Sequence, residues 1–173
     1  MAILTVPDFR ITITPQPAEG TLVSAVLSPA RLMLLGFNLP VEISTASIFR
    51  KPPAKAPFPS ITVIAHFDTG ASVTSVDIEL AKYLNLTATG QSESNTASGK
   101  QVMPNFAVDI AFPGTKLSPF YNLRIGSCRL GFDLENNMKP ERPQNMGILL
   151  GRDIMSRWNI VWNGPASSVT VSD

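Results

Sequence analysis

The chain of 173 residues carries 14 Lys and Arg against 13 Asp and Glu, so its formal net charge is only +1. This balance gives no electrostatic reason to expect a nucleic acid or an anionic membrane surface as a partner. The single cysteine, Cys128, excludes an internal disulfide framework, and one cysteine with one histidine argues against a His/Cys metal site. The length suits one domain, and 15 prolines among short alternating apolar runs favour an all-β fold.

The chain start gives no sign of a secretory signal, because no basic stretch precedes a long apolar one. The most apolar later window, residues 22–41, is interrupted by Pro29, Arg31 and Pro40, which argues against a membrane span. We therefore expect a soluble cytoplasmic protein.

The first third of the chain contains several strand candidates. Residues 9–14 alternate at period two, and residues 21–27 and 31–37 are further candidates. Asn38-Leu39-Pro40 predicts a turn before an apolar segment at 41–43. We interpret residues 1–60 as an N-terminal extension packed on the core, and residues 61–173 as the main domain.

Residues 50–59 contain four prolines, which remove hydrogen-bond donors and fix φ, so this segment cannot form regular structure. It predicts an exposed loop or extended connector. A proline-rich ligand for a partner module and a site cleaved during maturation are the alternatives.

An apolar strand at residues 61–65 leads, through His66 and Phe67, directly into Asp68-Thr69-Gly70. The glycine allows the backbone to approach a neighbour closely or to adopt positive φ. A half-buried carboxylate is costly unless it is partnered or protonated, and such sites are where function concentrates. Asp68 is therefore the leading functional candidate, whereas His66, on the same strand face, predicts a partly buried ring with one backbone partner.

The rest of the chain alternates short strands with turns. A helix is predicted over 76–84, with Ser75 as its N-cap and with Glu79 and Lys82 on one face. The polar tip at 96–100 lies between extended arms and predicts a hairpin. Strands are expected at 106–112 and 121–125; Gly126 ends the second one, which resumes over 128–132. A surface loop at 133–145 and a short helix at 154–158 follow. The chain then forms a terminal hairpin of 160–162 and 168–171 around Asn163-Gly164.

Two separate segments carry a family resemblance. Residues 68–72, Asp-Thr-Gly-Ala-Ser, resemble the active-site turn of the retropepsin-like (retroviral-type) aspartyl proteases. Residues 147–155, Gly-Ile-Leu-Leu-Gly-Arg-Asp-Ile-Met, resemble the apolar-apolar-Gly-Arg-Asp/Asn segment of the same family and occur in the expected order. The resemblance covers roughly residues 61–171. It implies a mostly β fold, a closed or partly open β-barrel of the retropepsin (acid protease) type with one or two short helices.

The resemblance also implies roles for individual residues and no metal or cofactor. They are Asp68 as the catalytic acid, Thr69 and Gly70 as support, Ala71 and Ser72 with Ala97, Ser98 and Gly99 of a flap tip as substrate-binding residues, and Ile148, Leu149, Leu150, Gly151, Arg152 and Asp153 as the structure behind the site. Ser72 departs from the retroviral pattern, in which an acidic residue pairs with the arginine. Arg152 must therefore bind another partner, Asp77 or a backbone carbonyl.

A single Asp-Thr-Gly implies a homodimer, because peptide hydrolysis by this route needs two carboxylates around one water. No other acid lies in such a turn: Asp109 is within a predicted strand and Asp133 within a loop. The sequence thus predicts a homodimeric aspartic endopeptidase, a hydrolase acting on an extended peptide or protein substrate. The alternative is a catalytically inactive retropepsin-like dimerisation or peptide-binding module.

Overall fold

The computed structural model describes residues 3–6, 9–14, 22–26, 36–50, 59–96, 99–137 and 146–173. Strands dominate these ranges, as the sequence predicts. The strands are β1 (Ile3–Val6), β2 (Phe9–Thr14), β3 (Leu22–Val26), β4 (Asn38–Thr45), β5 (Ser60–Phe67), β6 (Ser75–Asp77), β7 (Ala88–Thr96), β8 (Gly99–Ala111), β9 (Phe120–Cys128), β10 (Met146–Leu150), β11 (Asn159–Asn163) and β12 (Ser168–Ser172). The helices are η1 (Ser47–Phe49), α2 (Ile78–Tyr83), α3 (Leu134–Asn137) and α4 (Arg152–Met155).

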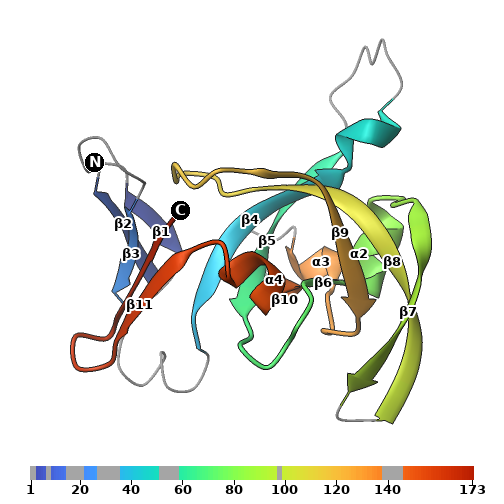
Figure 1. Ribbon diagram of the computed structural model, residues 1–173. Coiled ribbons are helices and arrows are strands. Elements are labelled where there is room, and N and C mark those ends of the chain that lie inside the picture. Colours follow the sequence, from blue (N-terminus) through green and yellow to red (C-terminus); the bar gives the residue numbers. More distant parts are fainter. Residues whose placement is uncertain are drawn as a thin grey trace.

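The centre of the structure is a closed barrel (Figure 1). One sheet runs in the order β4-β5-β10-β6-β9-β8-β7, and β4 also pairs with β8. That extra pairing joins the two sides of the sheet, so six strands form a ring and β7 stays outside it as the outer arm of a hairpin with β8. Closure removes open strand edges from the ring. The predicted mostly β fold with a closed barrel and short helices is confirmed.

The barrel core follows from period-two alternation in its strands. The first residue of β5 is exposed, and the residues after it are alternately buried and half-buried. The buried residues Val63 and Ala65 are fully covered. Ile148 and Leu150 of β10 are equally covered. Each such aliphatic side chain contributes about 1.5–3 kcal/mol on burial. An aromatic group closes one end of this core, and its members are Phe37, Phe67, Phe112, Phe120 and Trp158, with ring centroids 4.5 to 6.0 Å apart.

A second sheet joins segments from both ends of the chain, in the order β1-β2-β3-β12-β11. β12 lies between β3 and β11, so residues near 25 pair with residues near 170 (Figure 1). The strands predicted at 9–14 and 21–27 and the terminal hairpin are confirmed. The loop of that hairpin spans 164–167, longer than the bare Asn-Gly turn. The domain boundary at residue 60 stays a prediction.

The turn predicted at Asn38-Leu39-Pro40 is wrong, because all three residues belong to β4. β4 pairs with β5 from Asn38 to Ser44, whereas its pairing with β8 begins only at Glu42. Proline lacks an N–H and is tolerated in a strand where one side is unpaired. Pro40 lies in such a stretch, so its missing donor removes no bond to β8.

The helix predicted over 76–84 starts later, at Ile78, and its N-cap is Asp77 and not Ser75. Ser75 and Val76 pair with β10 and β9 and are therefore held in β6. The Asp77 carboxylate accepts the Glu79 N–H at 2.8 Å, as a capping residue does.

Two further expectations are corrected. Gly126 does not end a strand, because β9 continues through it to Cys128, and residues 129–133 form no strand. A Cβ at Gly126 would lie 3.1 Å from the Ser75 hydroxyl, so the glycine allows β6 and β9 to approach closely. Part of the predicted 133–145 loop is the helix α3. The predictions for residues 31–35, 51–58, 97–98 and 138–145 lie outside the described residues.

No helix within the described ranges is long and apolar enough to cross a membrane.

Candidate active site

Asp68 follows β5 directly, and its N–H continues the hydrogen-bond pattern of the strand. The Phe67 N–H donates to the Phe37 carbonyl at 3.0 Å on one side, and the Asp68 N–H donates to the Leu150 carbonyl at 3.0 Å on the other. Side chains two residues apart in an extended strand lie on the same face. The barrel wall therefore presents Asp68 and His66 on one face.

The Asp68 carboxylate is half-buried, and its two oxygens differ. Oδ1 accepts the Gly70 N–H at 2.7 Å, whereas no residue in the described ranges donates to Oδ2. A Cβ on Gly70 would lie 3.0 Å from Oδ1, so glycine permits this close approach. One oxygen is thus fixed by the backbone, and the other is open to bind a water or a substrate.

The turn after Asp68 is held by backbone bonds and lies at the surface. The Ala71 N–H donates to the Asp68 carbonyl at 3.1 Å, and the Arg152 N–H donates to the Ala71 carbonyl at 2.9 Å. Thr69 and Ser72 are exposed. The two segments that resemble the protease family in sequence are therefore in direct contact.

Behind the turn, Thr74 and Asp153 are joined by three hydrogen bonds. The Thr74 N–H donates to Oδ1 and Oδ2 of Asp153 at 2.9 and 3.0 Å, and its hydroxyl donates to Oδ1 at 2.8 Å. The same hydroxyl accepts the Gly151 N–H at 3.0 Å. Thr74 is fully buried. Sequence reasoning assigned it no role, because only its place after the turn distinguishes it.

Gly151 lies against the backbone of the next segment. A Cβ at this position would lie 2.5 Å from the carbonyl carbon of Val73 and 2.7 Å from the Thr74 nitrogen. Both are backbone atoms that cannot rotate away. Only glycine fits between β10 and α4 at this point.

Arg152 binds the turn through its side chain as well. Its Nη1 donates to the Thr69 carbonyl at 2.6 Å and to the Gly70 carbonyl at 3.3 Å. Of the two partners that the sequence left open, the structure therefore shows backbone carbonyls and not Asp77. Ser72 consequently leaves no unpartnered charge at Arg152.

The apolar run before Gly151 divides between two faces. Ile148 and Leu150 are fully covered in the barrel core, whereas Leu149 is half-buried on the opposite face. That all three pack beneath the active site stays a prediction.

The hairpin predicted around residues 96–100 is formed by β7 and β8, with Thr96 paired to Gly99. Gly99 has φ of +105°, a conformation that favours glycine. Ala97 and Ser98, predicted to contact substrate, lie outside the described residues. In Figure 1 the hairpin and the segment after β5 both extend to the lower side of the barrel.

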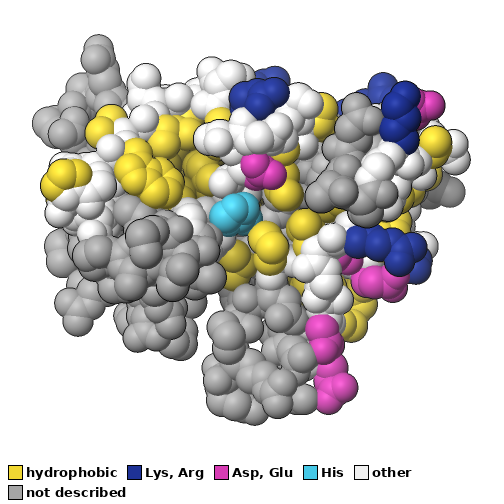
Figure 2. Space-filling model, turned by 90° about the horizontal axis from the view of Figure 1, so that it is seen from below, with side chains coloured by type: hydrophobic (Ala, Val, Ile, Leu, Met, Phe, Trp, Pro, Cys, Tyr) yellow, Lys and Arg dark blue, Asp and Glu magenta, His cyan; other side chains and the backbone are white. Residues whose placement is uncertain are grey.

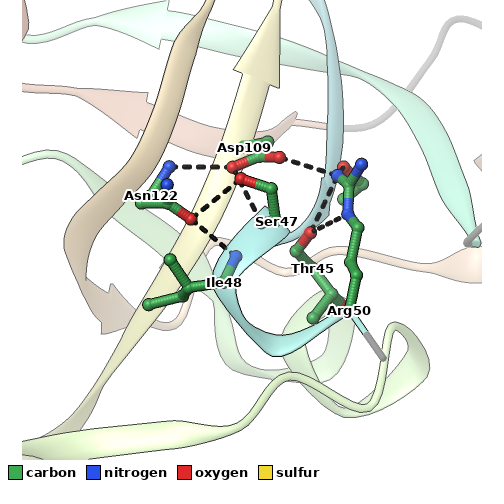
Figure 3. A network of polar contacts seen from close by, with 7 residues as sticks. Thr45, Ser47, Ile48, Arg50, Asp109 and Asn122 are labelled. Carbon is green, nitrogen blue, oxygen red and sulfur yellow. Dashed lines mark hydrogen bonds and ion pairs between the residues drawn. The ribbon is translucent and has the colours of Figure 1, made fainter. Parts of the chain in front are cut away.

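Asp109, a buried acid, is fully engaged in structural contacts (Figure 3). Its Oδ1 accepts the Asn122 N–H at 2.8 Å and the Ser47 N–H at 3.3 Å, and its Oδ2 pairs with Arg50 at 2.7 Å. The Asn122 side chain accepts the Ile48 N–H at 2.9 Å. This network fixes η1 onto β8 and β9.

Asp77 is the other buried acid, and its carboxylate is also engaged in structural hydrogen bonds. Besides the α2 cap, its Oδ2 accepts the Leu130 N–H at 2.6 Å. Burial of the Cys128 thiol raises its pKa to about 11, and the negative charge of Asp77 is the second, smaller cause of this rise. Among the described residues, the buried acids therefore have structural tasks, and Asp68 is the acid with an open oxygen at a surface turn.

His66 is partly buried, as expected, but its partner is a side chain. Its Nδ1 lies 2.9 Å from the Asn38 Oδ1 across the β4–β5 pair. Asn38 is a residue that sequence reasoning missed, because 28 positions separate the two.

No protein-family model matches the chain, and no curated protein matches it. Among solved structures, the chain is similar to a retropepsin-like aspartic protease from Rickettsia conorii. The likeness has 14% sequence identity, covers 79% of this chain and 81% of that chain, and has a TM-score of 0.44.

Proposed function

We propose that this protein is an aspartic endopeptidase that acts as a homodimer, with Asp68 of each protomer meeting across a two-fold axis. The observation that carries the proposal is the geometry of Asp68: Oδ1 is fixed by the Gly70 N–H at 2.7 Å, and Oδ2 is open at a surface turn. The sequence resemblance of the turn and of residues 147–155 gives the geometry its interpretation.

The chemistry needs two such carboxylates around one water. An ionised carboxylate takes a proton from the water, and a protonated one hydrogen-bonds the carbonyl oxygen of the scissile bond. Two carboxylates about 3 Å apart cannot both ionise, so the pair shares a proton, as aspartic proteases illustrate. The Gly70 N–H donates to Oδ1 of Asp68 and so fixes the orientation of the carboxylate.

A second copy of the chain is the source of the second carboxylate in this proposal. The buried acids of the described residues, Asp77 and Asp109, accept backbone N–H groups that they would have to release. An isologous contact instead brings the same Asp68 from both protomers to one axis. The exposed Thr69 beside it would form hydrogen bonds between the two turns.

The C-terminal hairpin supplies an apolar surface that a second copy would cover. β11 is an edge of the five-stranded sheet. Its side chains Val161 and Trp162 are 60% and 52% exposed. The two side chains lie on opposite faces of the strand, and the strand edge beside them is a surface with which another chain pairs.

The experiment is cleavage of a peptide library at mildly acid pH by the wild type, by Asp68→Asn and by Asp133→Asn. Asp68→Asn removes the proton-accepting oxygen and should abolish cleavage, whereas Asp133→Asn makes the same chemical change at an exposed loop position and should retain it. A hydroxyethylene peptide mimic should inhibit the wild type. Cleavage that persists in Asp68→Asn would refute the proposal, and partner binding without any cleavage would favour the inactive module.

A further inference from the structure

One row of side chains crosses the barrel beside Asp68. Strand register places Asn38 opposite His66, His66 opposite Leu149, and Leu149 opposite Ser75. All four are half-buried. The next row along the same strands is fully covered and faces the core; it consists of Leu39, Ala65, Ile148 and Val76. The half-buried row therefore faces away from the core, on the face that Asp68 shares.

Within this row, the ring of His66 is held in one orientation. Nδ1 lies 2.9 Å from the Asn38 Oδ1, and an amide oxygen only accepts, so Nδ1 carries the proton. Gly36, with φ of +65°, lies against the ring, where a Cβ would be 2.9 Å from Cε1. No residue in the described ranges bonds Nε2. The ring is thus fixed along one edge and leaves one nitrogen to bind something else.

The face that carries this ring is open at the surface. Figure 2 shows the histidine, the only one in the chain, reaching the surface with hydrophobic side chains on either side and an acidic group beside it. A strand advances about 3.3 Å per residue, so His66 lies roughly 6.6 Å along the backbone from Asp68. An extended peptide has the same spacing, so a residue within two positions of the scissile bond would place its side chain against His66.

We propose that His66 makes the enzyme selective for a peptide with a carboxylate side chain, Asp or Glu, within two residues of the scissile bond. This inference rests on the proposed protease function. In a protonated imidazole both nitrogens are donors. Nε2 then donates to a carboxylate, and such charge-assisted hydrogen bonds are about twice as strong as neutral ones.

The other groups that face His66 do not compete for this role. Its row neighbours Asn38, Leu149 and Ser75 are uncharged. Arg152 is committed to the Thr69 and Gly70 carbonyls. In the proposed dyad, Asp68 is occupied by the catalytic water and the scissile carbonyl. Among the described residues of this row, His66 is therefore the one basic side chain.

The experiment compares matched peptides that carry Glu or Gln on one side of the scissile bond and then on the other. The two side chains have nearly the same shape and differ in charge, so the ratio of their kcat/KM values isolates the carboxylate. We expect the kcat/KM of the wild type for the Glu peptide to exceed that for the Gln peptide by about tenfold or more. A tenfold ratio corresponds to about 1.4 kcal/mol. His66→Leu should bring the ratio close to one and improve cleavage of a Leu-containing peptide.

Two further variants make the result decisive. His66→Gln keeps a group that can bond Asn38 but cannot become charged, so it should also lose the Glu preference even if His66→Leu folds poorly. Ser75→Ala removes an uncharged member of the same row and should keep the preference. Thermal unfolding of each variant establishes that it is folded.

Each outcome has one meaning. Equal cleavage of Glu and Gln peptides by the wild type, or a Glu preference that survives both His66 variants, overturns the role of His66 and leaves the protease proposal standing. Absence of cleavage of every peptide by the wild type refutes the protease proposal, and the selectivity falls with it.

Discussion

The Asp153 carboxylate binds both polar groups of Thr74, the N–H at 2.9 Å and the hydroxyl at 2.8 Å, across 79 positions of sequence. This contact joins α4 to the segment after the Asp68 turn. The turn itself has few side-chain contacts, so its position depends on this support.

Thr74→Val should lower stability and activity together. Valine keeps the shape of threonine but leaves the Gly151 N–H without its acceptor, a buried loss of about 1–3 kcal/mol. Thr74→Ser retains the hydroxyl and should lose much less. Denaturant unfolding of both variants measures the difference; equal stability of the two would contradict the role given to the hydroxyl.

Gly151→Ala should destabilise the fold by about 3 kcal/mol or more, because its Cβ would overlap backbone atoms that are 2.5 and 2.7 Å away. Gly164→Ala is the matched control, since no atom lies within 4 Å of a Cβ there, and its effect should stay within about 0.5 kcal/mol. Thermal unfolding measures both. A Gly151→Ala protein as stable as Gly164→Ala would show that the described approach of the two segments is wrong.

Arg152→Leu should lower kcat/KM more than it lowers stability. Its guanidinium is exposed but fixes two carbonyls of the turn that carries Asp68. Loss of one such charged hydrogen bond, about 1.4 kcal/mol, corresponds to about tenfold in rate. Arg152→Lys, which can still reach one carbonyl, should have a kcat/KM between those of the wild type and Arg152→Leu. A full loss of folding in Arg152→Leu would instead assign it a core structural role.

Arg50→Ala should destabilise the barrel by about 2 kcal/mol, because it leaves the Asp109 carboxylate, only 8% exposed, without its cation. This loss of stability is smaller than the loss for a fully buried ion pair, because the Arg50 side chain is 32% exposed. Lys82→Ala breaks the Lys82–Glu79 pair, which is exposed on both sides, and should cost less than about 0.5 kcal/mol. Urea unfolding of the two variants tests this contrast.

Cys128 should react slowly with thiol reagents in the folded protein. Burial, and then the charge of Asp77, raises the pKa of its thiol to about 11, from an ordinary value of 9.0. The reactive thiolate therefore forms only as the pH rises toward 11, and at pH 8 its fraction is about a hundredfold smaller than in the unfolded chain. Reaction rates in buffer and in denaturant measure the ratio; equal rates would show an accessible, ionised thiol.

The parts of the fold that sequence predicted are those with local patterns. Alternation revealed β2, a run of apolar β-branched residues revealed β5, and the Asn-Gly turn signal revealed the terminal hairpin. Two short motifs located Asp68 and Arg152. Pro40 and Gly126 were misread as breaks, because local propensity carries no information about which strand edge is unpaired or which strands pack closely.

The supporting contacts of the site were not predictable for the same reason. Thr74 meets Asp153, and His66 meets Asn38, across 79 and 28 positions. Neither pair has a spacing that a helix or a hairpin imposes. His66 meets Asn38 through the pairing of β4 with β5, and Thr74 meets Asp153 because β6 pairs with β10, which leads into α4.

The central claim is that two protomers each supply one Asp68, and mixing active and inactive chains tests it most directly. Wild type and Asp68→Asn are combined at a fixed total concentration, allowed to exchange subunits, and assayed for peptide cleavage. If both carboxylates are required, an equal mixture retains only about one quarter of the wild-type activity, because random pairing leaves that fraction of dimers intact. Retention of one half, in proportion to the wild-type chains present, would mean that each chain works alone and would contradict the account.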